Sequence, residues 1–259
     1  MIKVELLEFY ITNVCNLTCR GCNRFNDGKF KGHQRWSDHS DLYEQWPQYI
    51  TPEHIVLIGG EPTLNPDLEL YVSNLRRLWP NSEITIQTNG TYTNVQKIDW
   101  WETYQVSFGV SIHDPSTEKT IKSDWNQIGP TIDAYVFNQP NLINKGTHWE
   151  PHNSDPDTAF KACDMATCHT MFNGKLYKCP MMAIMPEFAQ QFEVRTTEKQ
   201  QQLLDSFQPL TVDSTEQERE QWQANIDSHI PQCSLCKEEH VWSTALGPEK
   251  TNLPPPIYE

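Results

Sequence analysis

The chain has 259 residues, of which 37% are hydrophobic, and this length is enough for one α/β body with a modest appendage. No apolar run approaches the roughly 20 residues that a helix needs to cross a bilayer, so we expect a soluble protein without a membrane-spanning segment. The formal net charge of −14 at pH 7 repels phosphate backbones, which excludes nonspecific nucleic-acid binding and favours a small or weakly charged substrate.

The first half of the chain alternates between short β-branched runs and amphipathic segments. We predict strands at residues 4–11, 54–58, 83–87, 106–112 and 131–137, and helices at 40–49, 67–79 and 94–101. Strands that alternate with helices indicate a parallel sheet. Because Glu5 interrupts any apolar stretch at the N-terminus, we expect no signal peptide and a cytoplasmic location.

Beyond residue 138 the periodicity gives way to a stretch rich in Pro, Asn, Gly and His, which indicates a domain boundary. We predict one domain over residues 1–150 and a second over residues 151–259. Two polar helices are predicted in the second domain, at 196–207 and 214–229. Ser214 and Gln217 have the spacing of a capping box at the start of the later helix.

All eight cysteines fall into two groups. The first group is a CxxxCxxC motif after the first strand, made of Cys15, Cys19 and Cys22, and the second contains Cys163, Cys168, Cys179, Cys233 and Cys236. Tight thiol clusters in a cytoplasmic chain indicate metal binding rather than disulfides. Three thiolates are one short of a closed zinc site, but they suit an iron–sulfur cluster that keeps one iron open for chemistry.

Two further loops follow predicted strands. They read Gly59-Gly60-Glu61-Pro62-Thr63-Leu64 after the second strand and Thr88-Asn89-Gly90 after the third. The carboxyl ends of parallel strands lie at one edge of a sheet, so both loops should lie near the first cysteine group. Paired glycines let a ligand approach the backbone, and the carboxylate of Glu61 can receive an ammonium group.

These three motifs together resemble those of the radical S-adenosylmethionine (SAM) superfamily. The resemblance covers residues 1 to about 138 and rests on the cysteine motif, the GGEPTL loop and the TNG turn, in that order. It implies a partial (β/α)6 barrel whose [4Fe-4S] cluster is held by Cys15, Cys19 and Cys22 and binds SAM through its fourth iron. It also implies reductive cleavage of SAM to methionine and a 5′-deoxyadenosyl radical, which abstracts a substrate hydrogen.

The chain departs from the superfamily pattern around the nucleoside of SAM. Many members carry an aromatic residue before the third cysteine, where this chain has Gly21, so Tyr10 is our candidate for packing against adenine. No clear glycine-rich and acidic motif marks the fifth strand. Ser111 and His113, at the end of the fourth strand, are therefore the candidates for ribose contacts.

The later cysteines resemble the SPASM and twitch auxiliary domains of the same superfamily, with a G-x4-C segment that ends at Cys179 and a distant CxxC pair. Five remaining cysteines cannot supply two full clusters, so the resemblance implies one auxiliary [4Fe-4S] cluster. The preferred ligands are Cys168, Cys179, Cys233 and Cys236, with Cys163 a substitute ligand, a spare thiol or a hydrogen-atom donor. A zinc site with four thiolates is the alternative.

The expected function is that of a radical SAM enzyme that oxidises or rearranges a small-molecule, nucleoside or sugar-like substrate. Because the chain begins directly at its first strand, without a leader-binding domain, peptide crosslinking or epimerisation is the alternative within the superfamily. A noncatalytic zinc-stabilised binding protein and an iron–sulfur electron carrier are the alternatives outside it, but neither explains the GGEPTL loop.

A basic stretch lies within and after the first cysteine group. Residues 20–35 carry five basic side chains against Asp27 alone, on a chain that is acidic as a whole. This patch is a candidate for docking an acidic electron donor such as flavodoxin or ferredoxin, or for binding an anionic substrate. An ordinary solvated loop is the other interpretation.

Overall fold

The computed structural model describes residues 1–17, 22, 24–25, 30–91, 100–113, 115–125, 132–136, 148–149 and 151–238. The strands of the first half are β1 (Ile2–Thr12), β2 (Ile50–Gly59), β3 (Glu83–Thr88), β4 (Val106–Ile112) and β5 (Ile132–Val136). The helices between them are α1 (Trp36–Tyr43), α2 (Leu68–Leu78) and α3 (Glu118–Trp125), with short 3-10 turns η1 (Trp46–Gln48), η2 (Pro62–Leu64) and η4 (Pro115–Thr117).

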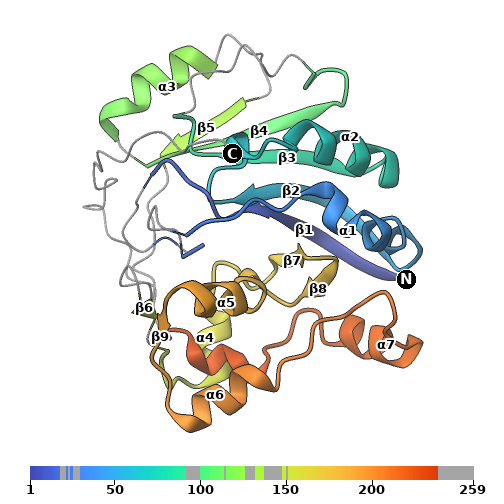
Figure 1. The fold of residues 1–259 in the computed structure, drawn as a ribbon, viewed down its shortest axis with the longest axis vertical. Helices are drawn as coiled ribbons and strands as arrows, with labels where there is room; N and C mark the ends of the chain where they lie inside the picture. The colour runs from blue at the N-terminus through green and yellow to red at the C-terminus, as the bar shows by residue number, and fades with distance from the viewer. Residues whose placement is uncertain are drawn as a thin grey trace.

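The second half supplies short strands and further helices. These are β6 (His148–Trp149), α4 (Pro156–Lys161), β7 (His169–Phe172), β8 (Lys175–Tyr177), α5 (Pro180–Gln191), β9 (Glu193–Val194), α6 (Glu198–Asp205), α7 (Glu216–Ala224) and the 3-10 turn η5 (Pro231–Leu235). Figure 1 shows α4, α5 and α6 gathered on the side of β7 and β8, while α3 lies beyond the opposite end of the sheet. None of the described helices is long and apolar enough to span a membrane.

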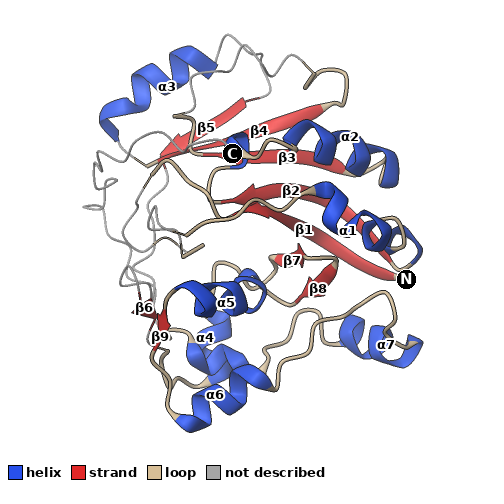
Figure 2. Cartoon of the chain, in the orientation of Figure 1, coloured by secondary structure: helices blue, strands red, loops and turns tan. Residues whose placement is uncertain are grey.

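One seven-stranded sheet runs through both halves, in the order β5-β4-β3-β2-β1-β7-β8 (Figure 2). Strands β1 to β5 are parallel to their neighbours, β7 is parallel to β1, and β8 returns antiparallel to β7. The expected α/β class with a mostly parallel sheet is thus confirmed. The five consecutive strands β1 to β5 are consistent with the expected partial barrel, and among the described residues a further parallel strand, β7, pairs with β1 at the other end of this row.

Most predicted elements of the first half are present. The strand at Val106–Ile112 has the predicted bounds, and the helix predicted at 40–49 is instead α1 followed by η1. Pro47 lies in the first turn of η1 and has no backbone N–H to donate, which prevents one continuous helix through this segment. The helix predicted at 94–101 falls almost wholly on residues outside the described ranges.

The predicted capping box is wrong by one residue. The N-cap of α7 is Thr215, whose hydroxyl accepts from the amide of Glu218 while the Glu218 carboxylate accepts from the amide of Thr215. Ser214 instead accepts a hydrogen bond from the amide of Thr211. Both pairs of residues have the required spacing, so only the turn that precedes the helix decides which pair caps it.

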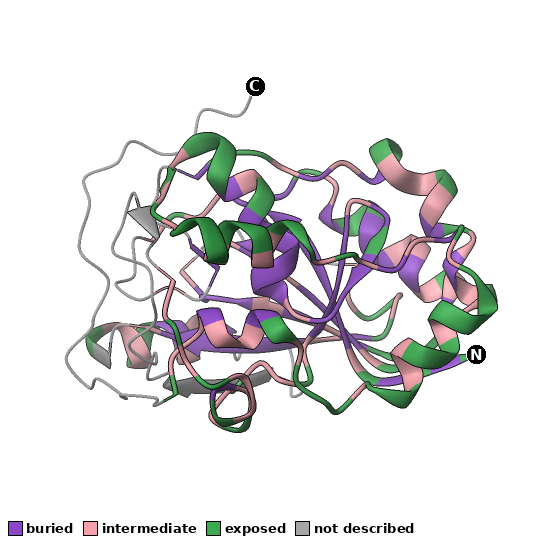
Figure 3. Ribbon diagram, turned by 90° about the horizontal axis from the view of Figure 1, so that it is seen from below, coloured by how far each residue is buried: buried purple, intermediate pink, exposed green. Residues whose placement is uncertain are grey.

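Two hydrophobic cores lie on opposite faces of the sheet. The larger core joins the sheet to α1 and α2 through residues such as Phe9, Leu57 and Tyr71. The smaller one, which we call the α5 core, contains Tyr10, Phe25, Phe30, Phe172, Tyr177, Met181, Met182, Ala183, Ile184, Met185, Phe188 and Leu235. Figure 3 shows the buried strands in the middle of the molecule. Because the α5 core includes residues from β1 and from α5, the second half packs directly onto the sheet; the domain boundary at residue 150 stays a prediction.

Candidate active site

The GGEPTL loop is attached to the end of β1 by backbone hydrogen bonds. The amide of Gly60 donates to the carbonyl of Thr12 at 2.7 Å, and the amide of Glu61 donates to the carbonyl of Val14 at 2.7 Å. At Gly59 the two strands are so close that a Cβ atom would lie 2.4 Å from the carbonyl oxygen of Thr12. Glycine is therefore required at this position for the loop to reach the first cysteine group.

The carboxylate of Glu61 ties this loop to the TNG turn. It is fully buried, and its Oε1 accepts from the amide and hydroxyl of Thr63 and from the hydroxyl of Thr88, at 3.1, 2.5 and 2.7 Å. Its Oε2 accepts from the amide of Asn89 at 2.7 Å. Burial raises the pKa of Glu61, while these hydrogen bonds favour the charged form. One side chain thus fixes the positions of two loops that come from different strands.

The TNG turn in turn contacts the first cysteine. The side-chain amide of Asn89 donates to Oδ1 of Asn16 at 2.8 Å and lies 3.8 Å from the sulfur of Cys15. The amide of Leu17 also donates to that sulfur, at 3.4 Å. Gly90 has a φ of +72°, a left-handed conformation that closes the turn beneath Asn89. The motif loops of β1, β2 and β3 therefore meet at one edge of the sheet.

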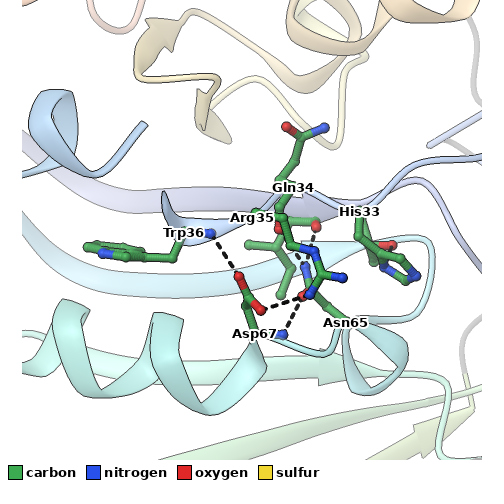
Figure 4. Close-up of polar contacts among 8 residues, drawn as sticks. His33, Gln34, Arg35, Trp36, Asn65 and Asp67 are labelled. Carbon is green, nitrogen blue, oxygen red and sulfur yellow. Dashed lines mark hydrogen bonds and ion pairs between the residues drawn. The ribbon is translucent and has the colours of Figure 1, made fainter. Parts of the chain in front are cut away.

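Two side chains that sequence reasoning missed hold the end of the cysteine loop, which we define as residues 13–33 (Figure 4). Asn65 donates to the carbonyls of Ile11 and Gln34, at 2.5 and 3.0 Å, and so joins both ends of the loop. Asp67 accepts from Arg35 at 2.9 Å and from the amide of Trp36 at 3.1 Å. The one sequence signal for Asn65 is its position directly after the GGEPTL loop.

Two of the five basic side chains predicted to form a patch in residues 20–35 are already paired with carboxylates. Arg24 is only 5% exposed and forms an ion pair with Glu8 at 2.6 Å, and Arg35 pairs with Asp67. Neither guanidinium is therefore free to attract an acidic electron carrier. Lys31 is exposed, whereas Arg20 and Lys29 lie outside the described residues.

The three residues predicted to contact the nucleoside of SAM, which are Tyr10, Ser111 and His113, lie in surroundings that differ from one another. Tyr10 is 1% exposed in the α5 core and packs edge-on against Phe172, with ring centroids 5.4 Å apart, so its ring has no open face for adenine. Ser111 accepts a hydrogen bond from the side chain of Gln87 at 2.6 Å, on the inner side of β4. Burial lowers the pKa of His113 to about 4, so its imidazole is neutral at pH 7. Cys19 lies outside the described residues.

The later cysteines gather in a second place. One cavity is lined by the thiols of Cys163, Cys179, Cys233 and Cys236, together with Met181, Met182 and Lys178. Cys168, which the spacing favoured over Cys163, is not among the lining residues. Its thiol lies beside Glu8 and Arg24 instead. Cys163 lines the cavity and Cys168 does not, so the preferred set of four thiols changes by one member.

The thiols of this cavity are buried. Burial raises the pKa of all four, to about 12 for Cys179, and at Cys163, Cys179 and Cys236 neighbouring thiols of the group raise the pKa further. Cys179 is also the N-cap of α5, where the backbone amides of Met181 and Met182 lower the pKa of its thiol against the effect of burial. No three Cys, His, Asp or Glu side chains within the described ranges are close enough to hold a single metal ion.

Comparison with known proteins agrees with the first of these sites. Residues 9–137 match the family model of the radical SAM superfamily. The chain carries a radical SAM superfamily domain. The expectation of an enzyme is thereby confirmed at the level of the superfamily, and the cysteine loop, the GGEPTL loop and the TNG turn all lie within the matched residues.

Two curated relatives align with parts of the radical SAM chain. A GTP 3′,8-cyclase of Nautilia profundicola is 27% identical over 92 residues, which are 35% of this chain and 29% of that protein. A 7-carboxy-7-deazaguanine synthase of Halobacterium salinarum is 30% identical over 116 residues, which are 45% of this chain and 43% of that protein. The alignments thus span less than half of either relative.

A solved structure shares the fold over most of the chain. It is that of BtrN in complex with AdoMet and 2-DOIA, with a TM-score of 0.56 and 15% identity. The likeness covers 92% of this chain and 98% of that one, so it extends well past the residues of the matched domain. At this identity the likeness concerns the fold alone.

Proposed function

We propose that the chain is a radical SAM enzyme that abstracts a hydrogen atom from a small-molecule, nucleoside or sugar-like substrate and so oxidises or rearranges it. The observation that carries the proposal is the contact of Asn89 with both Cys15 and Glu61. This contact brings the three superfamily motifs to one edge of the sheet. A zinc scaffold or a simple electron carrier has no need for the GGEPTL loop at that edge.

The residues of this edge fit a [4Fe-4S] cluster with SAM beside it. Cys15, Cys19 and Cys22 would hold the cluster, which supplies the electron that divides SAM into methionine and a 5′-deoxyadenosyl radical. The methionine ammonium would be received by the GGEPTL loop. The buried carboxylate of Glu61 already accepts four hydrogen bonds, so its main part is to keep the loop and the TNG turn in register for that contact.

We also propose one auxiliary [4Fe-4S] cluster, in a twitch-like region, held by Cys163, Cys179, Cys233 and Cys236. Support comes from the four thiols that line one cavity and from a backbone donor at one of them. The amide of Met165 donates to the sulfur of Cys163 at 3.4 Å, as the amide of Leu17 does to that of Cys15. N–H donors to thiolate sulfurs are a common device for stabilising iron–sulfur clusters.

The substrate class is supported by the names of the relatives. The two aligned enzymes are named for GTP and for a deazaguanine, and the structural neighbour holds 2-DOIA, which favours a small molecule over a peptide. We propose an external electron donor of the flavodoxin or ferredoxin kind. Because Arg24 and Arg35 are already paired, such a donor has fewer basic side chains to contact than the sequence suggested.

The test of the proposed function is anaerobic reconstitution with iron and sulfide, followed by metal analysis and a SAM cleavage assay with dithionite. We expect about eight irons per chain and the formation of methionine and 5′-deoxyadenosine. Purified protein that holds zinc at both sites, takes up no iron and leaves SAM intact would overturn the proposal. Release of 5′-deoxyadenosine only in the presence of a peptide would contradict the proposed substrate class.

Replacement of Glu61 by alanine is expected to weaken SAM binding while the cluster stays intact. The variant removes the acceptor of four hydrogen bonds and frees the GGEPTL loop from the TNG turn. A charge-assisted hydrogen bond is worth about 1.5–3 kcal/mol, so we expect the dissociation constant of SAM to rise tenfold or more. Isothermal titration checks this against Glu69→Ala, an exposed carboxylate on α2. Equal affinities in the two variants would contradict the assignment.

A further inference from the structure

Between the two cysteine sites lies a buried pair of polar side chains, Arg24 and Tyr10. Arg24 follows Cys22 by two residues, and Tyr10 projects from β1 into the α5 core. Burial raises the pKa of Tyr10, and among the nearby charges that act on its hydroxyl are the thiols of Cys22 and Cys15 and the guanidinium of Arg24. Tyr10 and Arg24 are therefore both buried near the first cysteine group.

Arg24 also reaches the second half of the chain. Its Nη2 donates to the Glu8 carboxylate at 2.6 Å, and its Nη1 lies 3.7 Å from the sulfur of Met165, whose amide donates to Cys163. One guanidinium thus contacts the segment that holds Cys163 while its backbone belongs to the loop of the first cysteine group.

Two donors in this space are buried without a partner. The Nε of Arg24 and the hydroxyl of Tyr10 make no hydrogen bond within the part of the chain that the structure describes. Arg24 is 5% exposed and Tyr10 is 1% exposed, so water does not readily satisfy either group. An unmade hydrogen bond at a buried donor costs about 1–3 kcal/mol, so a further acceptor at either donor would be favourable.

We propose that Arg24, held by Glu8, is a positioning residue that raises the reduction potentials of both iron–sulfur clusters. The inference rests on the proposed function, because it needs a cluster at each cysteine site. Reduction adds a negative charge to a cluster, and a fixed cation in a medium of low dielectric constant stabilises that charge. Hydrogen bonds toward cluster sulfurs shift the potential in the same direction.

Because Arg24 is paired with Glu8, the proposal predicts shifts of the reduction potential in opposite directions when one or the other side chain is removed. Removing the guanidinium leaves a carboxylate nearby and should make both clusters harder to reduce, whereas removing the carboxylate leaves an unopposed cation and should make them easier to reduce. A purely structural role for the pair predicts that both changes perturb the clusters alike. The direction of each shift therefore separates an electrostatic role from loss of packing.

The experiment is a redox titration of the reconstituted holoenzyme, followed by electron paramagnetic resonance, which distinguishes the two clusters. Arg24→Gln is expected to lower the potential of both clusters by about 59 mV or more, a tenfold change in a one-electron equilibrium, and Glu8→Gln to raise it. Arg24→Lys should restore much of the wild-type value. Arg77→Gln, which removes an exposed ion pair between α2 and Glu44, is the control and should cause no shift.

A double variant and a comparison of signs allow the measured potentials to be interpreted. Arg24→Gln leaves the Glu8 carboxylate buried without its partner, so the double variant Glu8→Gln/Arg24→Gln provides a neutral pair if the single variant folds poorly. Potentials unchanged in a variant that folds and holds its full iron would overturn the proposal, as would shifts of the same sign in Arg24→Gln and Glu8→Gln. Failure of the proposed function has a different signature, a wild-type protein without iron at one of the two sites.

Discussion

A triple variant with alanine at Cys15, Cys19 and Cys22 is expected to form no 5′-deoxyadenosine while it keeps about four irons per chain. The sulfur of Cys15 lies 3.8 Å from the side-chain amide of Asn89, beside the loops proposed to hold SAM. Without these thiols no cluster iron can bind SAM or pass it an electron. The retained irons belong to the second site, whose thiols are contributed by residues 163–236.

The control for this variant is its complement, Cys233→Ala/Cys236→Ala. It removes two of the four thiols of the second cavity and leaves the first group intact. We expect it to keep about four irons and the ability to cleave SAM with dithionite. Iron analysis and chromatography of the products distinguish the two variants. Full production of 5′-deoxyadenosine by the triple variant would refute the role given to the first cysteine group.

The features that sequence reasoning predicted well are those that local rules determine. Strand β4 has the predicted bounds because its alternation of large apolar and small residues is uninterrupted from Val106 to Ile112. The GGEPTL loop and the TNG turn follow their strands because glycines at 59 and 90 allow a close approach and a left-handed conformation. In parallel sheets such loops share an edge, so their proximity also followed from the pattern.

The features that it missed depend on contacts between distant segments. Asn65 joins Ile11 to Gln34, and Glu187 of α5 accepts from Asn13 at 2.8 Å across 174 residues. Neither contact has a signature in local spacing. Arg24 appeared to be one member of an exposed basic patch, because its ion pair with Glu8 exists only once the cysteine loop has packed against β1.

Strands β7 and β8 were missed for another reason. They contain four and three residues, which is too short for alternation to be seen. Yet β7 pairs with β1 and forms part of the sheet. The second half of the chain is thus attached to the strand that leads into the first cysteine group. This attachment explains why the two cysteine sites share Arg24 as a neighbour.

The second prediction with a large expected effect concerns which of the five later cysteines hold the proposed auxiliary cluster. Cys163→Ala is expected to lose the auxiliary cluster, so that iron falls from about eight to about four per chain, whereas Cys168→Ala should retain about eight. Cys163 lines the cavity with Cys179, Cys233 and Cys236, and its sulfur accepts from the amide of Met165 at 3.4 Å. The Cys168 thiol lies beside Glu8, and a carboxylate is a poor neighbour for a thiolate ligand.

The two variants are a matched pair, since each removes one buried thiol from the same short segment. Iron content and electron paramagnetic resonance of the reduced proteins measure the outcome, with SAM cleavage as the check that the first cluster is intact. With Cys163 as the fourth ligand, Cys168 is the one later cysteine that is not a ligand. Solvent-deuterium incorporation into the product therefore also tests whether Cys168 donates a hydrogen atom to a substrate radical. Iron lost from Cys168→Ala but kept in Cys163→Ala would reverse the ligand assignment, because the cavity seen here would then have to rearrange around the other thiol.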